Sequence, residues 1–208
     1  MSGSADDRRT VEVFSTSLRR HGQDYRALNW GSREGQENRF RVLCEIGLDA
    51  GDSLLDVGCG LGDLHDYLNR RGIAAAYSGI DITPDMVAAA AQRFPAATFH
   101  CASLLGGFEA PADGFDYVFA SGIFYLREEH PFDHLKASVA RMFHHCRKGV
   151  AFNCLSGWGE ANPGGGEYRE DPLRCLAFCR TLTPWVVLRH DYHPGDFTLY
   201  LRKGAQRS

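Results

Sequence analysis

The sequence contains no run of 18 or more apolar residues, so it predicts no membrane-spanning helix. Its first seven residues lack the basic and then apolar order of a secretory signal peptide, and we therefore expect a cytoplasmic protein without a membrane partner. The net charge of −3 supplies no overall positive field for nucleic acid, and we expect none as a partner. Repeats and low-complexity tracts are also absent, and 208 residues with 44% hydrophobic content can bury one core, so we expect one domain over residues 1–208.

Cysteines at metal-binding spacing are scarce. The seven cysteines fall mostly inside apolar strand or helix patterns, as reduced, buried thiols do, and an odd number fits poorly with a closed disulfide framework. Cys175 and Cys179 lie four residues apart, and His144-His145-Cys146 offers the ligand types that zinc prefers. Neither has a matching CxxC partner elsewhere, so we expect these side chains to pack in the core and predict no metal site.

The most informative motif lies in residues 54–63, where a buried-strand pattern leads into three alternating glycines and then a helical pattern. Glycine is needed in such a turn because it accepts a positive φ and lets the main chain approach a ligand closely. The spacing Gly58-x-Gly60-x-Gly62 is GxGxG and is followed by Asp63, whereas dinucleotide-binding turns have GxGxxG. The motif therefore predicts a nucleotide-binding turn and argues against NAD.

Strand and helix patterns alternate along the chain. Helical patterns cover residues 7–20, 32–48, 64–72, 84–94, 135–146 and 171–182, and strand patterns cover 53–58, 77–81, 98–101, 115–121, 149–155, 185–192 and 197–202. The link 193–196 is too short for a crossover helix, so the last two strands must pair antiparallel. With helices between the first five strands, we expect an α/β fold with a doubly wound, mostly parallel seven-stranded sheet and an antiparallel last strand. Residues 1–50 would form an N-terminal helical cap on a core of 51–203.

The glycine turn resembles motif I of a known family when its acidic neighbours are included. Asp56 stands two residues before the first glycine, and Asp81 is an acidic end of the second strand. This arrangement is similar to that of the class I S-adenosylmethionine (SAM) dependent methyltransferases, whose fold is Rossmann-like, and the antiparallel hairpin extends the resemblance over 53–203. The resemblance implies SAM as cofactor, S-adenosylhomocysteine (SAH) as product and a ligand-binding core at residues 51–203.

The expected cofactor contacts lie at the carboxyl ends of the strands, where ligands of such sheets bind. Asp81 would accept hydrogen bonds from both ribose hydroxyls, with Ile82 and Met86 beside the adenine. Asp56 and Asp63 would face the SAM ammonium directly or through water, or else Asp56 fixes the turn and Asp63 caps the following helix. The remaining expected contacts are Gly58, Cys59, Gly60, Ala102, Ser103, Leu104, Ala120, Ser121, Trp30 and Arg39. Among them, Cys59 is interpreted as a small packing residue and Ser103 or Leu104 as the reader of the adenine edge, where the family often has an acidic residue.

The sequence after the fourth strand, Ala120-Ser121-Gly122-Ile123-Phe124-Tyr125, lacks the Asn/Asp-Pro-Pro-Tyr/Phe pattern of enzymes that methylate nucleobases or planar amides. We therefore expect a small-molecule acceptor, methylated on O, N or C. The predicted acceptor contacts are Tyr25, Tyr125, Asn153, Ser156, Trp158 and Tyr168, and His193 or His190 is the candidate general base. The glycine-rich loop 157–166 would be a mobile lid.

Two other functions remain open at the level of sequence. The protein could cyclise or cleave SAM itself on the same fold, or it could bind SAM without catalysis. Methyl transfer is an in-line displacement that depends chiefly on positioning and on exclusion of water, so a base is needed only for a protonated acceptor. We expect a monomer or a homodimer.

Overall fold

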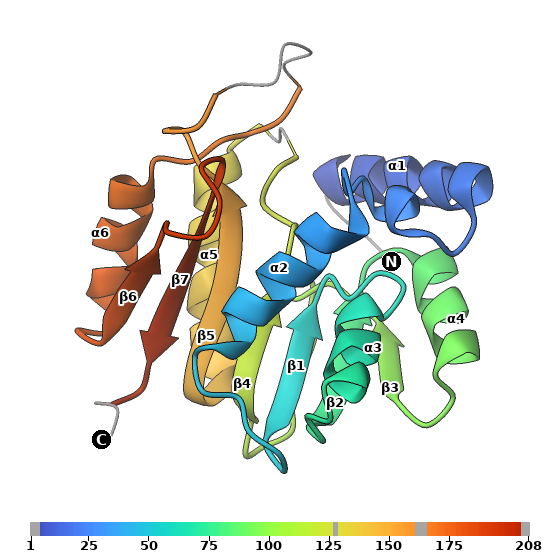
Figure 1. The fold of residues 1–208 in the computed structure, drawn as a ribbon, viewed down its shortest axis with the longest axis horizontal. Helices are drawn as coiled ribbons and strands as arrows, with labels where there is room; N and C mark the ends of the chain where they lie inside the picture. Colours follow the sequence, from blue (N-terminus) through green and yellow to red (C-terminus); the bar gives the residue numbers. More distant parts are fainter. Residues whose placement is uncertain (1–4, 127–128, 161–165, 205–208) are drawn as a thin grey trace.

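The computed structural model describes residues 5–126, 129–160 and 166–204. Its sheet has seven strands in the order β3-β2-β1-β4-β5-β7-β6, and all strands are parallel except β7 (Figure 1). The strands are β1 (Ser53–Val57), β2 (Ala76–Asp81), β3 (Thr98–Cys101), β4 (Phe115–Ala120), β5 (Cys146–Leu155), β6 (Val186–Arg189) and β7 (Asp196–Arg202). The predicted fold class, including the reversed last strand, is confirmed.

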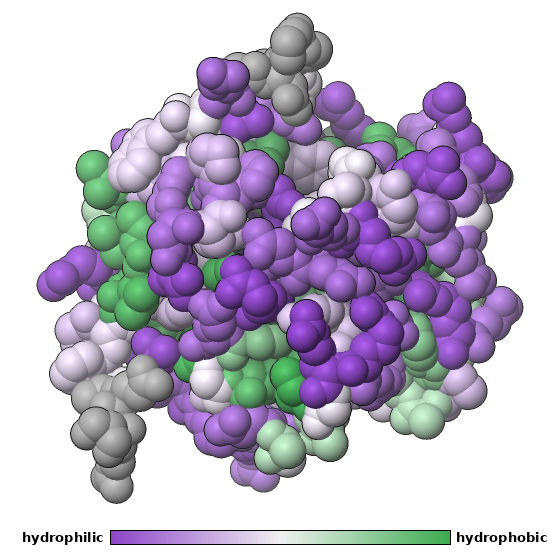
Figure 2. All heavy atoms as spheres, viewed as in Figure 1, coloured by the Kyte–Doolittle hydropathy of each residue, from purple (hydrophilic) through white to green (hydrophobic). Residues whose placement is uncertain are grey.

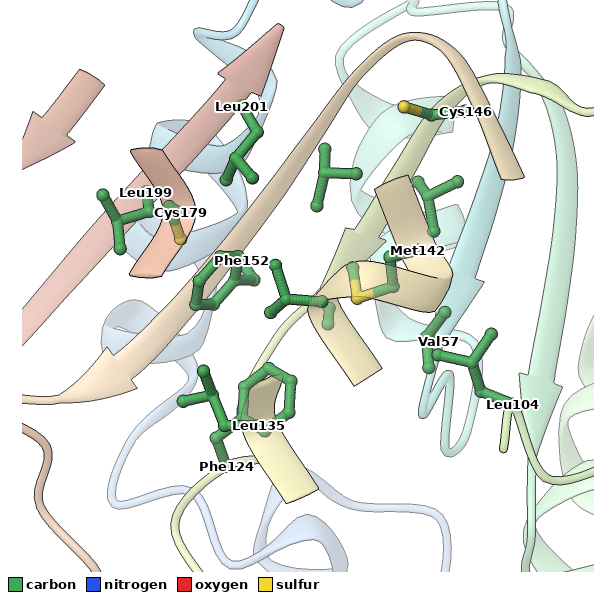
Figure 3. Close-up of a cluster of buried hydrophobic side chains, with 14 of the residues drawn as sticks. Val57, Leu104, Phe124, Leu135, Met142, Cys146, Phe152, Cys179, Leu199 and Leu201 are labelled. Carbon is green, nitrogen blue, oxygen red and sulfur yellow. The ribbon is translucent and has the colours of Figure 1, made fainter. Parts of the chain in front are cut away.

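Helices cover both faces of the sheet. They are α1 (Ala5–His21), the short 3-10 helix η1 (Tyr25–Leu28), α2 (Arg33–Cys44), α3 (Asp63–Arg70), α4 (Pro84–Arg93), α5 (Pro131–His145) and α6 (Pro172–Leu182). One apolar cluster lies between the sheet and α5 with α6, and a second lies between the sheet and α2 with α3. Figure 3 shows part of the first cluster, in which Val57 and Leu104 pack near Met142. Each face of the sheet is therefore buried, as the apolar strand patterns require.

The expectation of a helix between every pair of the first five strands is wrong for one link. Residues 102–114, between β3 and β4, contain turns and no helix. The sequence shows no helical pattern in this link, and Phe108 and Ala110 cover that part of the first apolar cluster instead. Several boundaries also differ: α2 ends at Cys44, β5 begins at Cys146, α5 begins at Pro131, and β6 covers only Val186–Arg189.

Strand register brings the carboxyl ends of the central strands together. Val57 at the end of β1 pairs with Ile80 of β2 and with Ala120 at the end of β4. The residues that directly follow these strands therefore meet at one edge of the sheet. In Figure 1, α1 lies across this edge of the molecule.

A third, smaller apolar cluster attaches α1 to the rest of the fold. Phe14 and Leu18 of α1 pack against Leu28 of η1 and against Met86 and Ala89 of α4. α1 packs chiefly on η1 and α4. The first helix thus covers the carboxyl edge of the sheet without belonging to either main core.

The buried cysteines behave as apolar side chains. Cys146, Cys154, Cys175 and Cys179 all lie in the apolar cluster beside α5 and α6. Burial raises the pKa of the Cys146 thiol to about 11, so this thiol stays protonated near neutral pH. No group of three His, Cys, Asp or Glu side chains within the described ranges is placed to hold a metal ion.

The surface is mostly hydrophilic in the view of Figure 2, and apolar residues gather on its left side, over α6 and β6. The exposed large apolar side chains include Leu173 of α6 and Val187 of β6. None of the helices in the described part of the chain is long and apolar enough to cross a membrane.

Candidate cofactor and acceptor site

A cavity of about 570 Å³ opens at the carboxyl ends of β1, β2, β3 and β4. The volume falls in the range of small-molecule sites. Val57 and Leu104, which belong to the core cluster, form part of its lining, and Phe14 of α1 and Leu28 of η1 line it from the opposite side. The cavity therefore lies between the sheet edge and the N-terminal helices.

The glycine turn forms one wall of this cavity. Gly58, Gly60 and Gly62 have φ values of 73°, 51° and 76°, in the region that side chains rarely adopt. The backbone N–H groups of Gly58 and Cys59 donate to the carbonyl of Ile80 at 2.8 and 3.0 Å, which fixes the turn to the end of β2. The predicted positive φ is thus confirmed at all three glycines, and the close approach of the main chain to a ligand stays a prediction.

The side chain of Asp81, at the end of β2, is fixed by two backbone N–H groups. One carboxylate oxygen accepts the Gly60 N–H at 3.0 Å and the other accepts the Thr83 N–H at 2.8 Å. Burial raises the pKa of Asp81, and these backbone hydrogen bonds oppose that increase. Because each carboxylate oxygen has two lone pairs, both oxygens can still accept a bond from a ligand hydroxyl.

Asp56 lies at the end of β1 and is only 3% exposed. Its carboxylate accepts the Tyr77 hydroxyl at 2.7 Å. Burial raises the pKa of Asp56 to about 7; the Tyr77 hydrogen bond opposes the increase, and the nearby carboxylates of Asp81 and Asp63 add to it. A ligand cation beside Asp56 would therefore remove a substantial electrostatic cost.

Asp63 connects three helices. Its carboxylate accepts from the Arg93 guanidinium of α4 at 2.8 Å and from the Gln36 amide of α2 at 3.1 Å. Arg93 also donates to the carbonyl of Leu61, within the turn. Asp63 lines the cavity, and its two oxygens join α2 and α4 to the start of α3. The alternative role of Asp63, as a side-chain cap of α3, is not seen, because α3 has no side-chain cap hydrogen bond.

The comparisons with known proteins agree with this geometry. A family model described as a methyltransferase domain matches residues 54–149. A Mycobacterium tuberculosis protein named "Putative methyltransferase Rv1506c" is 38% identical over 162 residues, which are 74% of this chain and 94% of that protein. The chain belongs to the class I SAM-dependent methyltransferases. It is an enzyme of that class, and SAM is its cofactor.

Other relatives of the methyltransferase are similar over shorter spans or in fold alone. A trans-aconitate 2-methyltransferase of M. tuberculosis is 41% identical over 61 residues, and the match covers 28% of this chain and 23% of that enzyme. The structure of magnesium protoporphyrin IX methyltransferase from Synechocystis PCC 6803 with bound SAM has a TM-score of 0.71 at 15% identity, covering 98% of this chain and 100% of that one. The [4+2]-cyclase SpnF has a TM-score of 0.63 at 17% identity and 82% coverage of both chains. One fold therefore accommodates different reactions.

The cavity of the methyltransferase brings together most of the predicted cofactor residues. The members that line it are Asp56, Gly58, Cys59, Gly60, Asp63, Asp81, Ile82, Met86, Ala102, Ser103, Leu104, Ser121 and Trp30. Ala120 is fully buried behind this wall. Arg39 is also outside the lining: its guanidinium pairs with Asp196 and donates to the Gly35 carbonyl at 2.7 Å, and the Trp30 ring lies over it at 4.9 Å. Arg39 thus supports Trp30 from behind.

Of the predicted acceptor residues, Tyr125 lines the cavity, and its hydroxyl accepts from the Asn29 amide at 2.9 Å. Asn153 lies one layer behind: it accepts the Gly122 N–H at 2.9 Å and donates to the Ser121 hydroxyl at 3.1 Å. The other predicted members outside the lining are Tyr25, Ser156, Trp158 and Tyr168. The expected lid over 157–166 includes residues 161–165, which lie outside the described residues.

The two candidate bases do not line the cavity of the methyltransferase. His190 contacts the Ser156 hydroxyl at 2.7 Å, and its ring lies 5.2 Å from that of Trp158. His193 is 47% exposed, with Nδ1 3.0 Å from the Asp196 carboxylate. Both imidazoles are therefore engaged by residues outside the cavity lining, which the alternation of side chains along the strand could not reveal.

Part of the cavity wall was not found from the sequence. The largest missed groups are Asp6, Asp7, Thr10 and Phe14 of α1 and, around the start of α5, Leu126, Glu129, His130, Asp133, His134 and Ser138. The start of α5 follows β4, so its place at the carboxyl edge of the sheet was an available signal. The position of α1 was not, because an amphipathic stripe indicates which face is buried but not what covers it.

Proposed function

We propose that this methyltransferase transfers a methyl group from SAM to a small-molecule acceptor bound in the same cavity. The observation that carries the proposal is the extent of the cavity. Its lining continues from the glycine turn past Tyr125 to α1 and the start of α5, and these last elements contribute nothing to the predicted cofactor contacts. The cavity therefore offers walls for a second small ligand beside the cofactor.

Different residues near the glycine turn match the ribose, the adenine and the methionine part of SAM. Asp81 has lone pairs for two ribose hydroxyls, and Ile82 with Leu104 offers apolar contacts for adenine. Asp56, whose carboxylate lies under the turn, is matched to the ammonium of the methionine part. The acceptor is then expected beyond the turn, on the side of Trp30 and Tyr125.

SAM supplies a methyl group already activated by its sulfonium, so the protein has little covalent chemistry to perform. The residues of this chain hold both ligands at a reactive distance and exclude water, which accounts for the catalytic effect expected of such a site. Asn153 contributes by fixing Gly122 and Ser121 in the wall. Asn29 contributes by donating a hydrogen bond to the Tyr125 hydroxyl, which fixes the orientation of that group.

The proposal is tested in two steps. Calorimetry should show that SAH binds and that NAD does not, and Asp81→Asn should weaken SAH binding at least tenfold while Asp85→Asn, an exposed acid of the following helix, leaves it unchanged. The protein is then incubated with SAM and fractions of a small-molecule extract, and mass spectrometry follows SAH. SAH formation that depends on one fraction supports methyl transfer; loss of SAM without any acceptor would instead indicate an enzyme that cleaves or cyclises SAM.

A further inference from the structure

The charge of the cavity lining is strongly one-sided. Seven of the 26 acidic residues line it: Asp6, Asp7, Asp56, Asp63, Asp81, Glu129 and Asp133. Among the described residues, none of the chain's lysines or arginines does so, although the chain has 23 of them and a net charge of only −3. The acidic residues are therefore concentrated at this site rather than spread evenly over the surface.

Some of this negative charge is offset by nearby cations that stay outside the lining. Arg93 pairs with Asp63 at 2.8 Å, and Lys136 pairs with Asp133 at 2.7 Å. Arg39, the other arginine close to the wall, is engaged with Asp196. Neither Asp6 nor Glu129 has a lysine or arginine among its described ion-pair partners, and Glu129 is matched only by His130 at 4.0 Å. Asp6 and Glu129, the latter 84% exposed, therefore leave an excess of negative charge at the rim of the cavity formed by α1 and the start of α5.

The acidic residues form two groups with different places in the fold. Asp56, Asp63 and Asp81 belong to the ends of β1 and β2 and to the start of α3, where the cofactor is expected. Asp6 and Glu129 come from α1 and from the segment before α5, and neither is among the residues expected to contact the cofactor. The charge of the second group is thus available to the acceptor.

Aromatic rings line the same end of the cavity. Phe14, Trp30 and Tyr125 offer ring faces or edges there, and such faces attract organic cations. Carboxylate ligands are bound most strongly by the bidentate donors of arginine or by the charge of lysine, and the described lining provides neither. The two observations, acidic side chains and aromatic rings, favour the same kind of ligand.

We propose that the methyl acceptor is a small organic cation carrying a protonated amine, and that the α1 and α5 end of the cavity selects it over carboxylates. This inference rests on the proposed function, because it assigns a charge to the acceptor of that same site. The similarity to a trans-aconitate methyltransferase covers only 23% of that enzyme and therefore does not require a carboxylate acceptor here. The atom that receives the methyl group is a separate question.

The test uses ligands that place a charge in the acceptor end without knowledge of the natural acceptor. Three analogues of SAH, with nitrogen in place of sulfur, carry an aminopropyl, a hydroxypropyl or a carboxyethyl arm on that nitrogen. Calorimetry on the full chain should give the tightest binding for the aminopropyl arm, at least tenfold tighter than the carboxyethyl arm, with the hydroxypropyl arm between them. All three share the cofactor part, so their differences report the acceptor end.

Two double variants show where the preference originates. Asp6→Asn with Glu129→Gln should reduce the ratio of aminopropyl to carboxyethyl affinity at least threefold and leave SAH affinity within twofold. The matched control, Glu12→Gln with Glu34→Gln, removes the same charge from exposed positions of α1 and α2 outside the lining and should leave the ratio unchanged. The ratio in the wild-type protein should also fall as salt is added, because exposed charges are screened.

The outcomes separate this inference from the proposed function. If SAH itself fails to bind, the proposed function is wrong. If SAH binds but the carboxyethyl arm binds as tightly as the aminopropyl arm, the cationic acceptor is refuted while the cofactor site stands. If the ratio favours the amine and survives in the cavity double variant unchanged, the selection by the α1 and α5 end is refuted.

Discussion

The buried carboxyl of Asp56 predicts a specific dependence of stability on pH. Burial raises its pKa in the folded protein from 3.8, the value of an unperturbed aspartate, to about 7. Between these two pKa values the folded state holds a proton that the unfolded state has released, so this group makes the free energy of unfolding fall as pH rises. A shift of that size lowers the free energy of unfolding by about 4 kcal/mol once the pH is above both pKa values. About 2.5 kcal/mol of this loss falls between pH 5 and pH 8.

Asp56→Asn removes this titration and keeps the shape of the side chain. From pH 5 to pH 8 the wild type should therefore lose about 2.5 kcal/mol more unfolding free energy than the variant. Urea denaturation of the SAM-free protein at both pH values measures it, with the exposed Asp85→Asn as the control that shifts by less than about 0.5 kcal/mol. If wild type and Asp56→Asn lose stability in parallel over this range, the assignment of a raised pKa to Asp56 is refuted.

Three further predictions concern the turn and the hairpin. Gly58→Ala should reduce SAH affinity at least tenfold, because the new Cβ would lie 2.3 Å from an isoleucine side chain at a φ of +73°; a folded variant with wild-type affinity in calorimetry would contradict this. Asp196→Ala leaves the partly buried Arg39 without its carboxylate, so the unfolding free energy from urea titration should drop by about 3 kcal/mol, and a loss below about 1 kcal/mol would show that water replaces the pair. His193→Ala should change the transfer rate by less than about twofold, because His193 is outside the cavity; a hundredfold loss would restore it as the base.

The sequence was sufficient for features that depend on local rules. Gly58, Gly60 and Gly62 could be located because a positive φ restricts those positions almost to glycine, and all three have it. The antiparallel pairing of the last two strands followed from the length of one link, and β6 and β7 pair in that way. The family and the cofactor, inferred from the same turn, are confirmed.

The acceptor end could not be derived in the same way, because it depends on how elements pack. Asn153 stands at the end of β5, as predicted, yet its side chain supports Gly122 from behind the wall. His193 follows β6, but its Nδ1 accepts the Gly195 N–H at 3.0 Å and lies against Asp196, so its ring stays beside the hairpin. The direction of a side chain after a strand ends is set by tertiary contacts, which periodicity does not encode. The cofactor contacts of Asp56 and Asp81 and every acceptor contact stay predictions.

The attachment of α1 has a consequence for how acceptor preference can change. Phe14 and Leu18 connect this helix to η1 and α4 through the smallest of the three apolar clusters, while Asp6 and Thr10 of the same helix form cavity wall. Substitutions at Asp6 or Thr10 can therefore alter which molecule fits without disturbing the sheet, whereas changes at Phe14 or Leu18 reach Leu61 of the glycine turn through their shared cluster. A set of relatives that vary at the cavity positions of this helix, with its apolar face kept, is the natural starting point for redirecting the enzyme, since the two main apolar cores reside in other parts of the chain.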